Sequence, residues 1–145
     1  MFTARVTPRF GDVDGLRHIN NCLIPQWFEM GRDPLFRFFH PDLDLTHWNL
    51  IMASIHAEFT AQMRLGSDVE IRTWVKRIGK SSFDVYQEAW QDGILGAWGK
   101  AVVVYYDFVN KNSLPIPDDI RDQLEHHMLP PDAGVSGRRK ISTTH

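Results

Sequence analysis

The chain has 145 residues, 43% of them hydrophobic, which is typical of one folded domain. Sixteen Lys and Arg against eighteen Asp and Glu give a net charge of −2, which argues against a broad basic nucleic-acid-binding surface. The single cysteine, Cys22, excludes an internal disulfide and a zinc site of four cysteines. The longest apolar run, Ala101 to Tyr106, is far shorter than the ~20 residues of a membrane-spanning helix. With no signal-peptide pattern at the N-terminus, we expect a cytoplasmic protein without a membrane partner.

The N-terminal part of the chain predicts a strand, a turn-rich loop and a long helix. Residues 2–10 have a strand pattern, and residues 11–15 are rich in turn formers. Residues 19–39 place apolar side chains at helical spacing around much of the circumference. We expect Gly31 and the Asp33–Pro34 pair to break or kink this helix, with Asp33 as a new cap.

The rest of the chain predicts antiparallel strands that would wrap this helix. Asp92–Gly93 is a strong hairpin signal, and the other connections are too short for crossover helices. Residues 118–127 predict a short second helix. The sequence thus predicts an α+β domain over residues 1–128, with about five strands curled around one long helix, and a flexible tail over residues 129–145. The strands after the helix are expected at residues 51–60, 68–78, 82–91 and 95–107.

The densest group of chemically useful side chains lies in residues 10–21. Two carboxylates, an imidazole and two amides precede the helix: Asp12, Asp14, His18, Asn20 and Asn21. A helix start offers unpaired N–H groups that can polarise a carbonyl, and a nearby carboxylate could act as base or nucleophile. The alternative is structural, with the Asp and Asn side chains only capping the turn and the helix.

Other motifs carry weaker signals. The seven histidines lack metal-ligand spacing, so we expect no metal site, and no motif indicates a bound cofactor. The Gly93-x-x-Gly96-x-x-Gly99 spacing is not a dinucleotide-binding fingerprint, because it does not lie between a strand and a helix; these glycines permit close packing or a bulge. Glu29, three residues before Arg32, is expected to form a local ion pair, although a buried Glu could act as a second base. Positive charge gathers at Arg72, Lys76, Arg77 and Lys80, either as a solvated strand face or as a site for phosphate.

Taken together, these motifs resemble the hot-dog-fold thioesterases typified by 4-hydroxybenzoyl-CoA thioesterase. That family has the approximate pattern F-x-D-x-D-x-x-x-H-x-N-N followed by F-E-x-x-R on a helix. The matching residues here are Phe10, Asp12, Asp14, His18, Asn20, Asn21, Phe28, Glu29 and Arg32. The similarity covers about residues 3–125, and also includes Phe59, the Gly66–Asp68 turn and the segment from Ile78 to Phe83. One position departs from the family: Arg17 stands where members commonly have glycine, so we expect either a loop of different shape or a contact between Arg17 and substrate.

The resemblance implies an acyl-CoA thioesterase that releases a free acid and coenzyme A. It implies that Asp14 attacks the thioester or activates water, while a main-chain N–H near Asn21 stabilises charge on the carbonyl oxygen. Asp12, His18 and Asn20 would hold the loop, and Glu29 would be a possible second carboxylate. The resemblance also implies a homodimer or homotetramer with the site at the subunit interface. Candidates for binding the coenzyme A phosphates are Arg77, Lys80, Ser81 and Ser82.

Two other functions remain open on the sequence alone. A hot-dog hydratase or dehydratase acting on an acyl thioester would need an acid and a base, for which His18 and Asp14 are the nearby pair. A non-catalytic acyl-CoA-binding module would bind coenzyme A without releasing thiol. A shared fold does not by itself distinguish these functions.

Overall fold

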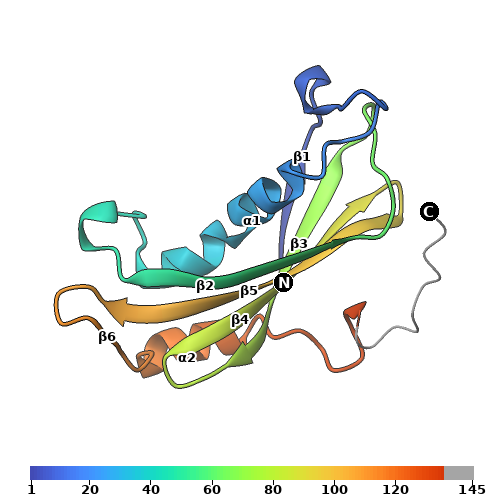
Figure 1. The fold of residues 1–145 in the computed structure, drawn as a ribbon. Helices are drawn as coiled ribbons and strands as arrows, with labels where there is room; N and C mark the ends of the chain where they lie inside the picture. The colour runs from blue at the N-terminus through green and yellow to red at the C-terminus, as the bar shows by residue number, and fades with distance from the viewer. Residues whose placement is uncertain (136–145) are drawn as a thin grey trace.

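The computed structural model describes residues 1–135, which form two α-helices, two short 3-10 helices and one antiparallel sheet (Figure 1). The elements in chain order are β1 (Phe2–Val6), η1 (Phe10–Asp12), α1 (Leu23–Phe39), η2 (Leu45–His47), β2 (Leu50–Phe59), β3 (Val69–Ile78), β4 (Ser82–Gln91), β5 (Ile94–Asp107), β6 (Asn112–Ser113) and α2 (Asp118–Glu125).

Five long strands build the sheet in the order β1-β3-β4-β5-β2, and the two-residue β6 pairs with the end of β5. Every pair of neighbouring strands is antiparallel. The β4–β5 hairpin turns at Asp92 and Gly93, both with positive φ, as the sequence predicts. Helix α1 crosses one face of the curled sheet (Figure 1). This is the expected hot-dog architecture, and β2 forms one edge of the sheet.

The sequence predicts that Gly31 and Asp33–Pro34 break or kink the helix; α1 runs continuously from Leu23 to Phe39, so a break with a new cap at Asp33 is wrong. Pro34 lies inside the helix and removes one N–H from its hydrogen-bond ladder. Gly31 is required for packing, because a Cβ there would lie 2.8 Å from Cγ2 of Ile71. The helix is not interrupted, because burial of its apolar side chains against the sheet outweighs these local preferences.

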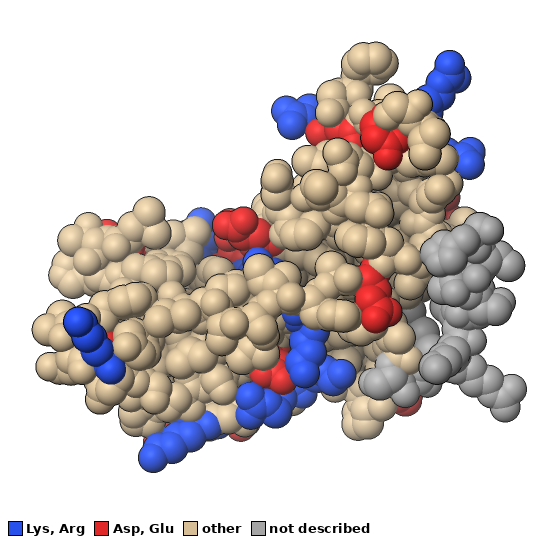
Figure 2. All heavy atoms as spheres, viewed as in Figure 1, with Lys and Arg blue, Asp and Glu red and all other residues tan. Residues whose placement is uncertain are grey.

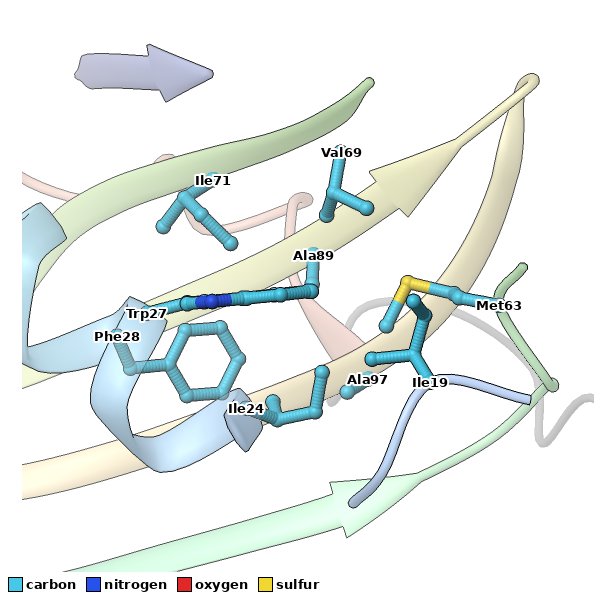
Figure 3. Close-up of a cluster of buried hydrophobic side chains, with 9 residues drawn as sticks. All are labelled: Ile19, Ile24, Trp27, Phe28, Met63, Val69, Ile71, Ala89 and Ala97. Atoms are coloured by element: carbon cyan, nitrogen blue, oxygen red, sulfur yellow. The ribbon is translucent and has the colours of Figure 1, made fainter. Parts of the chain in front are cut away.

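Two hydrophobic clusters fill the space between α1 and the sheet. In the cluster nearer the start of α1, Trp27 and Phe28 point from the helix toward β3, β4 and β5 (Figure 3). Ile19 and Met63 close the end of this cluster from two loops. The main-chain N–H of Ile19 also donates to the carbonyl of Met63 at 2.8 Å. The loop preceding α1 is therefore fixed to the core.

The segment after α2 packs along the sheet as far as the structure describes it. The main-chain groups of His127 and Leu129 bond Val75, beside the N-terminal end of β1. The N–H of Val135 donates to the hydroxyl of Tyr86 at 3.0 Å. Residues 136–145 of the expected tail lie outside the described residues. Within residues 1–135, neither helix has the length and hydropathy needed to cross a bilayer.

Candidate active site

The main chain of the loop between η1 and α1 wraps around the carboxylate of Asp14. Oδ1 of Asp14 accepts the N–H groups of Leu16 at 2.9 Å and His18 at 3.3 Å. The N–H of Asp14 donates to the carbonyl of His18 at 2.9 Å. No hydrogen bond to Oδ2 of Asp14 occurs within residues 1–135, and the side chain is exposed. One carboxylate oxygen thus holds the loop, while the other has no hydrogen bond within residues 1–135.

Arg17 occupies the tip of this loop with a φ of 65°, in the left-handed region. Its N–H donates to the carbonyl of Asp14 at 3.0 Å. Glycine adopts this conformation without steric cost, whereas a residue with a Cβ is strained in it. The loop therefore retains a glycine-type backbone although it has arginine at this position.

Asp12 and Asn20 support the same loop from inside. Asp12 is buried, and its Oδ2 accepts the N–H of Arg9 at 2.8 Å. The carbonyl of Asp12 accepts the N–H of Asn20 at 2.9 Å, and Oδ1 of Asn20 accepts the N–H of Cys22 at 3.0 Å. These bonds match the structural alternative for Asp12 and Asn20.

The N–H of Asn21 is the unoccupied donor at the start of α1. The N–H groups of Leu23 and Ile24 are bonded to the carbonyls of Asn20 and Asn21. Pro25 has no N–H, in the first turn where none is needed. Within residues 1–135 the main-chain N–H of Asn21 has no acceptor. It is available to an oxygen atom of a ligand.

A groove of about 790 Å³ brings Asp14, His18, Asn20 and Asn21 together at one end of the sheet. Its opposite wall comes from distant parts of the chain; Phe59 belongs to the family resemblance, whereas spacing along the chain does not indicate the other residues. Because β2 pairs with β5, Phe59 lies opposite Ala97, and the residues beyond β2 lie beside the β4–β5 turn. These further lining residues are Phe59, Thr60, Ala61, Gln62, Arg64, Ile94 and Leu95.

Glu29 and Arg32 lie at a different place. They line a second groove of about 310 Å³ near the middle of α1, so Glu29 is not beside Asp14 in the same chain. The expected local ion pair between them does not form within the described chain. The guanidinium instead turns toward the sheet, where Nη1 donates to Oε1 of Gln87 at 3.1 Å.

The candidate phosphate-binding residues lie at the far end of the sheet from Asp14. The β3–β4 turn that holds Lys80, Ser81 and Ser82 and the loop before α1 are at opposite ends in Figure 1. The ten residues of β3 separate them by about 30 Å. Arg77 is already paired with Asp84 at 3.1 Å and donates to Ser82. This turn does not reach the groove of its own chain.

Metal-binding side chains do not gather in this site. Across residues 1–135, no three His, Cys, Asp or Glu side chains are placed to hold one metal ion.

Comparison with known proteins adds an independent line of evidence. Residues 8–124 match the model of the thioesterase-like superfamily. A search of curated proteins finds no match. A predicted thioesterase from Bacillus stearothermophilus is 40% identical, with a TM-score of 0.85 over 90% of this chain and 98% of that chain. A thioesterase from Thermus thermophilus, solved with coenzyme A and Zn, is 26% identical, with a TM-score of 0.76 over 89% and 95% of the two chains. The chain therefore belongs to the thioesterase-like superfamily and has the hot-dog fold.

Proposed function

We propose that this protein hydrolyses the thioester bond of an acyl-CoA, with Asp14 as general base or nucleophile. The observation that supports this most directly is that Asp14 and Asn21 line the same groove, where a carboxylate oxygen and a main-chain N–H both lack a hydrogen-bond partner within residues 1–135. The Thermus neighbour that binds coenzyme A supports a coenzyme A thioester as the substrate.

The proposed chemistry uses each group for one task. The N–H of Asn21 donates to the thioester carbonyl oxygen, where negative charge develops as the carbon becomes tetrahedral. Asp14 either takes a proton from water as that water attacks the carbon, or attacks the carbon itself and forms an anhydride that water then cleaves. The C–S bond breaks, the sulfur leaves as thiolate and takes a proton, and the acid is released.

The test is Asp14→Asn, which keeps the size and much of the hydrogen bonding of the side chain. Loss of a general base typically slows a reaction by about 10²- to 10⁴-fold, so we expect thiol release from a panel of acyl-CoA substrates to fall by that factor. The exposed Asp42 provides a matched control, since Asp42→Asn removes a carboxylate away from the groove. Circular dichroism checks that both variants fold. Full activity in Asp14→Asn would overturn the role of Asp14 and leave Glu29 as the carboxylate candidate.

We further propose that two copies pair through the edge strand β2. β2 has a free edge within the described chain and carries the exposed side chains of Ile55 and Phe59, at 54% and 38% exposure. Antiparallel pairing about a two-fold axis keeps both helices on the same face and brings opposite ends of the two sheets together. The β3–β4 turn of one copy then approaches the Asp14 groove of the other. Light scattering should give twice the mass of one chain, and a monomer at micromolar concentration would exclude this arrangement.

A second function is supported by one observation, the presence of His18 in the same groove as Asp14. An imidazole and a carboxylate could add water across the double bond of an enoyl-CoA. Measuring the loss of enoyl-CoA absorbance alongside thiol release distinguishes the two reactions. Thermal stabilisation by coenzyme A with neither reaction would indicate a binding module.

A further inference from the structure

The groove at the middle of α1 is bordered by a buried arginine. Arg32 is only 3% exposed, yet it lines this groove together with the exposed Glu29. Figure 2 shows acidic and basic atoms close together in a hollow over the middle of α1. The remaining wall is apolar, and consists of Phe36, Trp48, Leu50, Met52, Ile55 and Val103.

The protein does not satisfy the hydrogen-bonding capacity of this guanidinium. Nη1 of Arg32 donates to Gln87, whose own Nε2 donates to the carbonyl of Phe28 at 2.7 Å and to Thr73 at 3.0 Å. Nε of Arg32 is buried and has no hydrogen-bond partner among residues 1–135. Burial lowers the pKa of Arg32, and the opposing effects of Glu29 and Asp33 are smaller. An unpaired buried donor and an undercompensated charge both cost free energy in the unliganded protein.

Because Nε is buried, an oxygen atom entering the groove would be bound through Nη2, for which no hydrogen bond occurs within residues 1–135. A guanidinium binds carboxylate, phosphate and hydroxyl oxygens strongly, because its N–H groups are charged and fixed in one plane. A phosphate at this place would meet an apolar wall, whereas a methylene chain with a polar end matches both the wall and the arginine.

We propose that this groove binds the far end of the acyl group, and that Arg32 selects acyl groups ending in an oxygen-bearing group, a carboxylate or a hydroxyl, over those ending in methyl. This inference rests on the proposed acyl-CoA thioesterase function and specifies its substrate class.

The position of the groove on β2 fits this role. It opens over the first half of β2, from Leu50 to Ile55, whereas the Asp14 groove opens at the other end, from Phe59 onward. Within one chain the two places are separated by about 14 Å along α1, from Leu23 to Arg32. Antiparallel pairing of β2 with a second copy places the first half of one strand beside the second half of the other. The Arg32 groove of one copy then borders the Asp14 groove of the other.

The test compares acyl-CoA thioesters of equal length, six or eight carbons, that end in methyl, hydroxyl or carboxylate. Charged hydrogen bonds predict a preference of about ten- to hundredfold in kcat/KM for at least one oxygen-bearing end. Arg32→Met should abolish that preference, and Arg32→Lys should restore part of it. Arg37→Met is the matched control, because Arg37 is exposed on the same helix outside the groove.

Two additions keep the test decisive. Glu29→Gln removes a repelling charge from an exposed position, so it should raise the relative affinity for the carboxylate end even if Arg32→Met does not fold. Because Glu29 is also the alternative catalytic carboxylate, this variant is compared by ligand affinity and not by rate. Non-hydrolysable thioethers of coenzyme A with the same three ends report affinity by calorimetry without turnover. Selective thioether binding without any thiol release would refute the hydrolase and retain the inference. Two results would refute the inference. The first is equal rates and affinities of the wild type for methyl and oxygen-bearing ends, and the second is a wild-type preference that the Arg32 and Glu29 variants leave unchanged.

Discussion

Replacing Gly31 by alanine has two opposite effects on stability: alanine favours the helix, but its methyl group overpacks the core between α1 and the sheet. The added Cβ would lie 2.8 Å from Cγ2 of Ile71, 2.9 Å from Nε2 of Gln87 and 3.1 Å from Oγ1 of Thr73. None of these neighbours can move easily, since all three are buried and Gln87 is hydrogen-bonded to Phe28, Thr73 and Arg32. The methyl group must therefore push α1 away from the sheet or break that network.

The magnitude follows from two opposing terms. Alanine is favoured over glycine inside a helix by about 1 kcal/mol. Overpacking a rigid core typically costs about 1–3 kcal/mol, and the fixed neighbours here favour the upper part of that range. We expect Gly31→Ala to lower the free energy of unfolding by about 1–2 kcal/mol.

Guanidinium unfolding followed by tryptophan fluorescence measures this change, at one protein concentration so that association does not alter the result. Gln26→Ala, at an exposed position of the same helix, is the control and should change stability little. A stability gain in Gly31→Ala would refute the reasoning, because it would mean that the helix and sheet can separate at no cost.

Two further predictions concern the loop and the C-terminal segment. Arg17→Gly should raise the free energy of unfolding by about 0.5–1 kcal/mol, since relief of left-handed strain exceeds the entropy cost of glycine. A lower free energy of unfolding in the same assay would mean that the arginine side chain itself stabilises the loop. The pKa of His127 is lowered from 6.5, chiefly by burial and then by the N-terminal ammonium and His126. The unfolded chain therefore takes up this proton first, and stability should fall as pH drops below 6.5. His127→Phe keeps the stacking on Phe2 and Phe38, and it should reduce the difference in free energy of unfolding between about pH 8 and pH 5. The same difference in the variant and the wild type would refute the role of His127.

The sequence predicts most elements well where local signals are strong. The expected strand at 82–91 matches β4 at both ends, because the Asp92–Gly93 turn marks where it stops. β1 ends at Val6 instead of residue 10, since Pro8 has no N–H for pairing and η1 follows it. Helix α1 begins at Leu23 and not at residue 19, because Ile19 is used to anchor the preceding loop to Met63.

Where the prediction fails, tertiary packing outweighs local preference. Gly31 and Pro34 are helix-breaking residues when considered alone, and neither interrupts α1. The pairing of Arg32 with Gln87 in place of Glu29 has the same origin. Spacing along a helix shows which side chains are able to meet, but the sheet beneath the helix determines which of them do.

The sequence by itself determined an antiparallel sheet curled around one long helix and a polar loop directly before that helix, because both follow from short-range patterns: strand alternation, hairpin turns, and polar residues before a helix. The hot-dog class and the choice of Asp14 and Asn21 within the loop came from the family resemblance. Only the tertiary structure decided what faces that loop. Thr60, Gln62 and Leu95 reach the groove through the register of β2 with β5, which joins segments far apart in the chain. The tertiary structure also placed the β3–β4 turn at the end of the sheet opposite Asp14, because the extended length of β3 separates this turn from the Asp14 loop.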